Sequence, residues 1–375
     1  MQGYIRSLDG LRAVAILLVM LFHFFFVLEV GWIGVQIFFV LSGFLITSIL
    51  LKSKENSFSS YIKRFYWRRA LRIFPLYYFY LLAIAGIYLV AKIPETFLQK
   101  APFLFTYTFN YYPLFYDYDY DAFFTHLWSL SVEEQFYLFW PFAIFFLNRQ
   151  QLRWLIYVVV LATPIIRYSL GELFYQSYAD LSILGEVVYR LTLSHMDAFA
   201  VGAAIPLFNL EVAVKKKKYW LGALTVLLLI IGLANFSSLT VDMNDTVNIT
   251  SLGYPIGGMR NMQHIWSYTL LNFWGGALIL YVASLKNEKS SLLVKVLENG
   301  LMVTIGRISY GMYVYHWVIF VMHKKFLHDV LVNTLLSFVV YFIVVFAVSY
   351  VSFHFFEKKF LEWKDRVKMP LVSRS

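Results

Sequence analysis

Apolar stretches long enough to cross a lipid bilayer recur along this chain from one end to the other. A helix needs about 20 apolar residues to span the hydrocarbon core of a membrane. The chain has 375 residues, of which 60% are hydrophobic and 14% charged, and this is more apolar surface than one water-soluble core can bury. We therefore predict an all-α fold, a polytopic integral membrane helix bundle that forms a single domain over residues 1–375.

The apolar runs predict about ten membrane-spanning helices. Basic residues concentrate in alternate connecting segments, such as residues 52–73 and the run Lys215–Lys218. Segments of this kind stay in the cytoplasm, so we expect both termini to be cytoplasmic. The predicted spans are 11–28, 33–51, 74–91, 126–147, 152–169, 194–210, 219–236, 267–285, 301–322 and 331–355.

The charge balance and the cysteine count narrow the functional classes. Lys and Arg number 32 against 22 Asp and Glu, an excess that membrane orientation explains without a nucleic-acid partner. The sequence contains no cysteine, which excludes thiolate metal sites and a cysteinyl acyl-enzyme. We expect membrane lipids around the protein and no bound metal.

A histidine lies inside the first apolar run. His23 follows Arg12 by eleven residues, which is about three helical turns, so both side chains are expected on one side of one helix, about 16 Å apart along its axis. An ionisable side chain at membrane depth is costly to keep and indicates a functional site.

The predicted topology places further polar residues at the depth of His23. A neutral imidazole can take a proton from an attacking hydroxyl while a carboxylate fixes its tautomer, which suggests that Glu133 pairs with His23. Alternatively, Glu133 is a structural clamp on another helix. His316 lies in the same layer, although a lone histidine is more often a hydrogen-bonded core residue. The layer also contains Glu134, Arg167, His195 and Asp197.

A second cluster of basic residues lies at the cytoplasmic entrance of the third span, in the aromatic amphipathic stretch 58–74. Arg69 and Arg72 are i,i+3 neighbours on a helix, so their guanidinium groups can grip one phosphate. The alternative is binding of lipid headgroups. A ligand with phosphates at these arginines and a thin arm reaching past Arg12 toward His23 has the shape of acyl-coenzyme A (acyl-CoA).

Five short motifs follow one another along the chain. They are Arg6–Arg12 leading to His23, Phe38–Ile46, Arg69–Pro75, His126–Tyr137 and Ile308–Trp317. In this order they resemble the membrane acyltransferase type 3 family, whose members O-acylate bacterial surface glycans and related molecules. The resemblance covers essentially the whole sequence.

The resemblance implies roles for individual residues. It makes His23 the catalytic histidine, puts Arg12 in the same essential motif, and assigns Arg69 and Arg72 to the acyl-CoA donor. It adds less for Glu133, which we keep as a second catalytic candidate. Glu134 and His316 are candidates for substrate binding. Some relatives carry a C-terminal extracytoplasmic hydrolase-like domain, and we expect none to be fused to this chain.

The expected function is that of an enzyme, a membrane-bound O-acyltransferase. It would move an acyl group, in the simplest case acetyl from acetyl-CoA, to a hydroxyl of a carbohydrate such as a surface polysaccharide or its lipid-linked precursor. The expected location is the cytoplasmic membrane of a bacterium. His23 would act as general base or carry the acyl group itself. The alternative is a proton-coupled membrane transporter, because histidine and glutamate at mid-membrane are also typical of such carriers.

Overall fold

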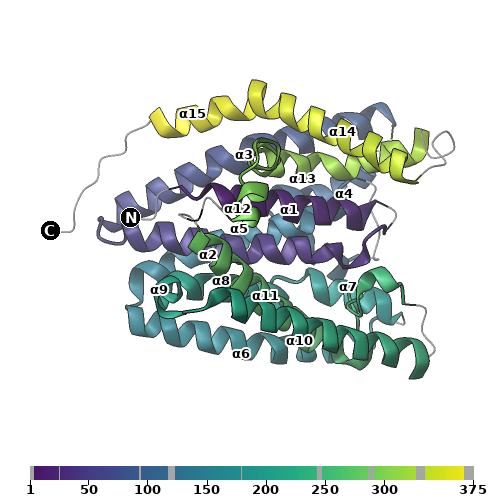
Figure 1. Cartoon of the computed structure of the whole chain (residues 1–375). Coiled ribbons are helices and arrows are strands. Elements are labelled where there is room, and N and C mark those ends of the chain that lie inside the picture. The colour runs from purple at the N-terminus through teal and green to yellow at the C-terminus, as the bar shows by residue number, and fades with distance from the viewer. Residues whose placement is uncertain are drawn as a thin grey trace. The chain divides into compact units, whose positions relative to one another are not determined.

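Helices make up the fold. The computed structural model describes residues 4–24, 26–92, 94–116, 123–178, 180–242, 247–285, 288, 291–326 and 334–366. These residues form helices joined by turns, and no strand occurs among them, which confirms the predicted all-α class (Figure 1). The predicted start of the last span, at residue 331, lies outside this set.

The helices group into two compact units. Met1–Ser48 and Leu147–Arg307 form the first unit, and Ile49–Phe146 and Ile308–Ser375 form the second. The single domain over residues 1–375 stays a prediction.

The first unit is organised around one central helix. Its helices are α1 (Arg6–His23), most of α2 (Ile33–Ser53), α6 (Arg149–Phe174), α7 (Leu181–Arg190), α8 (Met196–Leu207), α9 (Leu210–Ala213), α10 (Lys217–Ser237), α11 (Gln263–Ser284) and α12 (Leu292–Leu297). The helix α11 contacts α1, α6, α8 and α10. In Figure 1, α6, α10 and α11 run side by side.

Two glycines let α2 and α8 approach closely. A Cβ atom on Gly43 would lie 2.2 Å from the backbone oxygen of Phe199, and one on Gly202 would lie 2.0 Å from that of Val40. Inside a membrane, helix association depends on close van der Waals contact, and small residues permit it. The crossing of α2 and α8 therefore requires glycine on both helices.

The second unit contains the longest helix of the described residues, α3 (Phe58–Val90), which continues through Pro75 without a break. The predicted amphipathic stretch 58–74 and the predicted span 74–91 are thus one helix. The other elements are α4 (Pro94–Phe105), α5 (Trp128–Phe146), most of α13 (Gly300–Phe326), α14 (Thr334–Ser352), the π-helical turn η9 (Phe353–Glu357) and α15 (Lys358–Arg366). The helix α3 contacts α4, η9 and α15.

Tyrosine hydroxyls tie α3 to its neighbours. Tyr61 donates a hydrogen bond of 3.0 Å to the carbonyl oxygen of Pro141, and Tyr66 donates one of 2.7 Å to that of Leu138. Tyr77 donates in the same way to the C-terminal part of α4. These hydrogen bonds fix the position of α3 along α4 and α5.

Six helices in the described part of the chain are long and apolar enough to cross a membrane. They are Glu29–Ser53, Phe58–Val90, Arg149–Phe174, Lys217–Val241, Arg260–Ser284 and Thr334–Lys364. These six contain the predicted spans 33–51, 152–169 and 219–236 and most of 74–91, 267–285 and 331–355. The multi-pass character is therefore supported, whereas the count of about ten spans and the cytoplasmic termini stay predictions.

The other predicted spans correspond to α1, α5, α8 and α13. Each has a physical reason for not being among the six helices that are long and apolar enough to cross a membrane. The helix α8 has 12 residues and covers about 18 Å, less than the hydrocarbon thickness of about 30 Å. The helices α1, α5 and α13 contain the charged and polar residues that the sequence marks as site candidates, and these lower their hydropathy. The helix α4, in a segment predicted as a loop, was not expected.

The α2–α8 crossing predicts that Gly202→Ala destabilises the protein. The added methyl group meets backbone and forces the helices apart, which we expect to cost about 1–3 kcal/mol of unfolding free energy. Gly222→Ala on α10 is the control, because a Cβ there meets nothing within 4 Å. Thermal unfolding of the detergent-solubilised protein should show a lower Tm for Gly202→Ala alone, and equal Tm values would contradict the crossing.

Candidate functional site

Arg12 and His23 both belong to α1, and His23 is its last residue. The predicted helix 11–28 is therefore shifted toward the N-terminus. The imidazole is half-buried and meets the ring of Phe22 edge-on at 4.8 Å between centroids. His23 thus lies among the last carbonyl groups of α1, an environment that favours positive charge.

A buried carboxylate holds Arg12, and the sequence reasoning did not single it out. Asp9 accepts a hydrogen bond of 2.8 Å from Nη1 of Arg12 and another from the hydroxyl of Tyr4, and the Arg307 guanidinium approaches it to 3.9 Å. Burial, followed by the hydrogen bond to Asp9, raises the pKa of Tyr4, so its hydroxyl stays protonated and donates. The sequence could have indicated this pair, because Asp9 precedes Arg12 by three residues and therefore shares its helix face.

The second unit contains a pocket beside Arg69 with a volume of about 280 Å³. The Arg69 guanidinium lies 5.3 Å from the centroid of the Tyr137 ring and 5.9 Å from that of Phe65. Four aromatic rings, one cation and one carboxylate contribute to its lining. These residues are Tyr66, Phe74, Tyr107, Tyr137, Arg69 and Glu134, and Ala70, Thr106, Gln135 and Leu138 complete it.

Glu133 and Glu134 are neighbours in the sequence but have different surroundings. Residues i and i+1 point about 100° apart on a helix. Glu133 accepts a hydrogen bond from the hydroxyl of Tyr137, one turn further along α5. Glu134 lines the pocket and attracts Arg69 electrostatically. The carboxylate that this pocket presents is therefore Glu134, which the sequence reasoning ranked behind Glu133.

His316 is fully buried and belongs to a cluster of two histidines. Its Nδ1 lies 2.6 Å from the carbonyl oxygen of Tyr313, and because a carbonyl only accepts, Nδ1 carries the hydrogen. Its ring lies 5.1 Å from that of His126, which lies in turn 3.1 Å from the backbone oxygen of Val314. The sequence reasoning missed His126, although it opens one of the five motifs. The bond to its own helix supports the core-histidine interpretation of His316.

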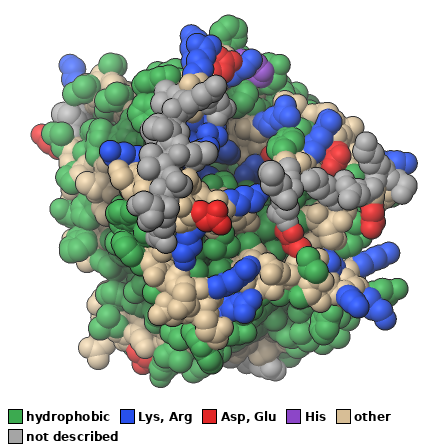
Figure 2. All heavy atoms as spheres, turned by 90° about the vertical axis from the view of Figure 1, so that its left-hand side faces the viewer, with side chains coloured by type: hydrophobic (Ala, Val, Ile, Leu, Met, Phe, Trp, Pro, Cys, Tyr) green, Lys and Arg blue, Asp and Glu red, His purple; other side chains and the backbone are tan. Residues whose placement is uncertain are grey.

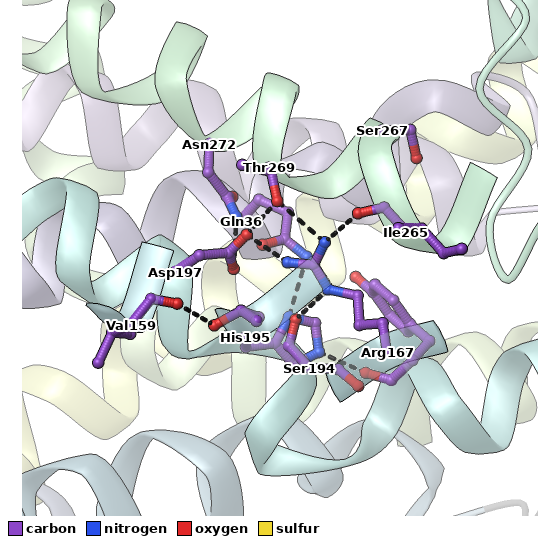
Figure 3. A network of polar contacts seen from close by, with 12 residues as sticks. Gln36, Val159, Arg167, Ser194, His195, Asp197, Ile265, Ser267, Thr269 and Asn272 are labelled. Carbon is purple, nitrogen blue, oxygen red and sulfur yellow. Dashed lines mark hydrogen bonds and ion pairs between the residues drawn. The ribbon is translucent and has the colours of Figure 1, made fainter. Parts of the chain in front are cut away.

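Arg167 and Asp197 form an ion pair in the first unit, and both side chains are fully buried. Figure 3 shows that the guanidinium of Arg167 also reaches backbone oxygens on two sides. It donates to the carbonyl of Ser194 at 2.9 Å and to that of Ile265 at 2.7 Å. The network therefore joins α6, α11 and the turn before α8.

Other polar side chains surround the Asp197 end of the ion pair. Asp197 accepts hydrogen bonds from Thr269 at 2.5 Å and from Asn272 at 3.1 Å. His195, which was predicted in the same layer, lies beside it and interacts with the amide of Gln36 at 3.1 Å (Figure 3). A buried ion pair with this many partners holds helices together. Arg167 and Asp197, which were predicted at the same depth, are thus in contact, and their ion pair has a structural role.

The candidates divide between the units. Arg12 and His23 lie in the first unit, and Arg69, Arg72, Glu133, Glu134 and His316 lie in the second. The proposed pair of His23 with Glu133 joins residues of both units and stays a prediction. Among the described residues, no group of three or more His, Asp or Glu side chains is arranged to hold a metal ion.

Comparison with known proteins assigns the chain to a family. A family profile described as an acyltransferase domain matches residues 5–354. The chain belongs to this acyltransferase family. No solved structure matches this acyltransferase chain.

Several curated bacterial proteins are similar to this acyltransferase chain. It is 28% identical to a putative O-acetyltransferase of Staphylococcus aureus over 91% of its own length and 54% of the relative. It is 29% identical to the O-acetyltransferase OatA of the same species, over 85% of the chain and 51% of the relative. A segment of 158 residues is 41% identical to the peptidoglycan O-acetyltransferase OatA of Listeria monocytogenes, covering 39% of this chain and 25% of that protein. The chain spans about half the length of the first two.

The buried ion pair predicts a large loss of stability for Asp197→Ala. The substitution leaves the Arg167 charge buried without its carboxylate, at a cost of about 3–5 kcal/mol. Glu362→Ala is the control, because the pair of Glu362 with Lys358 at 3.9 Å is exposed and is expected to contribute less than about 1 kcal/mol. Thermal unfolding in detergent measures both, and similar losses for the two variants would refute the structural role.

Proposed function

We propose that this protein is a membrane O-acyltransferase that moves an acyl group, in the simplest case acetyl, from acyl-CoA on the cytoplasmic side to a carbohydrate hydroxyl. The acceptor would be a surface polysaccharide or its lipid-linked precursor, in the cytoplasmic membrane of a bacterium. The observation that carries the proposal is the acyltransferase family match over residues 5–354, which includes the motif residues Arg12, His23, Arg69 and Arg72. The relatives named O-acetyltransferases support the acetyl group and the glycan acceptor.

His23 is proposed as the catalytic residue. In a direct transfer, the imidazole takes the proton of the acceptor hydroxyl while that oxygen attacks the thioester carbonyl. The carbon–sulfur bond then breaks, and the thiolate of CoA leaves and takes up a proton. In the covalent alternative, the imidazole nitrogen attacks first and an acyl-histidine then passes the acyl group to the hydroxyl. The position of His23 at the end of α1 supports either route, because both put positive charge on the ring.

Arg12, Arg69 and Arg72 are proposed to bind the donor, since guanidinium groups match phosphate geometry. Basic side chains are also visible among apolar ones in Figure 2. We assign this chemistry to the cytoplasmic side, where acyl-CoA is made. For the acceptor, we keep Glu134 and His316 as binding candidates. The aromatic pocket beside Glu134 supports the first of these, and Glu133 stays the second catalytic candidate.

The catalytic assignment predicts that His23→Ala abolishes acyl transfer without unfolding the protein. The measurement is release of free CoA thiol from acetyl-CoA by the purified full-length chain, with isolated cell-wall glycan as acceptor. Mass spectrometry of glycan from cells that carry the variant gives a second readout. Tyr219→Ala on α10 is the control, because Tyr219 is an exposed ring outside the proposed site. Transport of a solute without thioester consumption by the wild-type protein would overturn the enzyme proposal in favour of a carrier.

The donor assignment predicts that Arg69→Ala combined with Arg72→Ala weakens acyl-CoA binding. Hydrogen bonds to charged groups are each worth about 1.5–3 kcal/mol, so the loss should exceed tenfold, or about 1.4 kcal/mol. Titration calorimetry of the detergent-solubilised protein with acetyl-CoA measures it. Arg64→Ala combined with Arg68→Ala removes the same charge from the same helix. Equal losses in both double variants would indicate general attraction to phosphate or headgroups, not a donor site.

A further inference from the structure

A buried carboxylate close to Arg72 has no part in the mechanism described so far. Glu357 is the last residue of the π-helical turn η9, between α14 and α15, and only 8% of its surface is exposed. Single π-helical turns are rare and occur frequently at functional sites. A carboxylate kept away from water is costly unless it has partners, so its position needs an explanation.

Two hydroxyl groups and a glycine fix the position of the Glu357 carboxylate. The hydroxyl of Ser352 donates a hydrogen bond of 3.2 Å to Oε1 of Glu357, and the hydroxyl of Tyr315 lies 3.1 Å from that of Ser352. On α13, a Cβ atom at Gly311 would come within 3.1 Å of the same Oε1. Glycine at this position therefore leaves the space that the carboxylate occupies.

One face of α3 packs against this turn. Arg72, Leu76 and Phe79 are spaced i, i+4 and i+7, so they share that face. The ring of Phe79 lies 5.2 Å from that of Phe356, the neighbour of Glu357. A Cβ atom at Gly311 would also lie 3.8 Å from the side chain of Leu76, one turn beyond Arg72. The carboxylate and the Arg72 guanidinium are close enough to attract each other electrostatically.

The two arginines of the donor motif thus have different carboxylate neighbours. Arg69 faces α5 and interacts with Glu134 in the aromatic pocket, whereas Arg72 faces η9 and interacts with Glu357. A guanidinium held by a carboxylate on one side still offers N–H groups to a ligand on the other. Because the arginine side chain is already ordered, less conformational entropy is lost when the ligand binds, and the affinity is higher. The arrangement therefore favours one orientation of the Arg72 side chain before a ligand binds.

We propose that Glu357 is a positioning residue for Arg72, and that its carboxylate keeps the guanidinium in the orientation that binds a phosphate of the acyl-CoA donor. This inference rests on the proposed function, in which Arg72 binds the donor. It makes the junction of α14 and α15 part of the donor site, although its residues lie nearly 300 positions from Arg72 in the sequence, at 357 against 72.

The test is a double-mutant cycle with Glu357→Gln and Arg72→Ala, read as KM for acetyl-CoA and as kcat at saturating donor. Glutamine keeps the shape and the oxygen that Ser352 binds but removes the charge. We expect Glu357→Gln to raise KM on the order of tenfold with little change in kcat. The double variant should be no worse than Arg72→Ala, because Glu357 acts through Arg72. Glu362→Gln, on the exposed side of α15, is the matched control and should leave KM unchanged.

Each other outcome counts against the inference. Additive effects of the two substitutions, an equal fall in kcat, or a lower KM for Glu357→Gln would each refute a positioning role and leave the donor assignment intact. An unchanged KM for Arg72→Ala would instead remove the donor role of Arg72 and this inference with it. Should Glu357→Gln fail to fold, Ser352→Ala takes its place in the cycle, because it loosens the carboxylate without removing it. A KM that Ser352→Ala leaves unchanged would then refute the inference.

Discussion

A membrane interior offers no water, so the backbone polar groups of a membrane-spanning helix must find their partners within the protein. This constraint explains why the contacts that order the helices are polar in a chain with so much apolar surface. Arg167 ties α6 to Asp197 at the start of α8 and to the backbone of α11, and Tyr61 and Tyr66 fix α3 against α5. Apolar packing alone would allow helices to slide past one another, since lipid tails solvate Leu and Val equally well.

The same constraint makes charged residues useful for chemistry. Asp9 holds Arg12 at the start of α1, and His23 ends the same helix, so one rigid element carries both residues of the first motif. In the second unit, Arg69 and Glu134 come from distant parts of the sequence and meet at one aromatic pocket. Each unit therefore organises its own motif residues before any substrate is bound.

The sequence predicted the helical class, most apolar spans and the motif residues, because hydropathy and residue spacing are local properties. It could not predict that α3 passes through Pro75, since a local rule counts proline as a break in a helix. Depth arguments placed Arg167 and Asp197 in one layer but could not say which neighbours each would bind. Glu357 was not predictable for a further reason, because its burial depends on a glycine in another helix and on a turn between two helices.

The tyrosines of α3 show that the aromatic residues of this protein are of two kinds. At Tyr61, Tyr66 and Tyr77 the oxygen atom is the part that matters, because it donates a hydrogen bond to a backbone carbonyl of a neighbouring helix. At Phe79 and Phe356 only the shape of the ring is used. Phenylalanine and tyrosine, which differ by one oxygen atom, are therefore not interchangeable at the positions that fix this helix. Exchange of one ring for the other is tolerated only where packing alone is required.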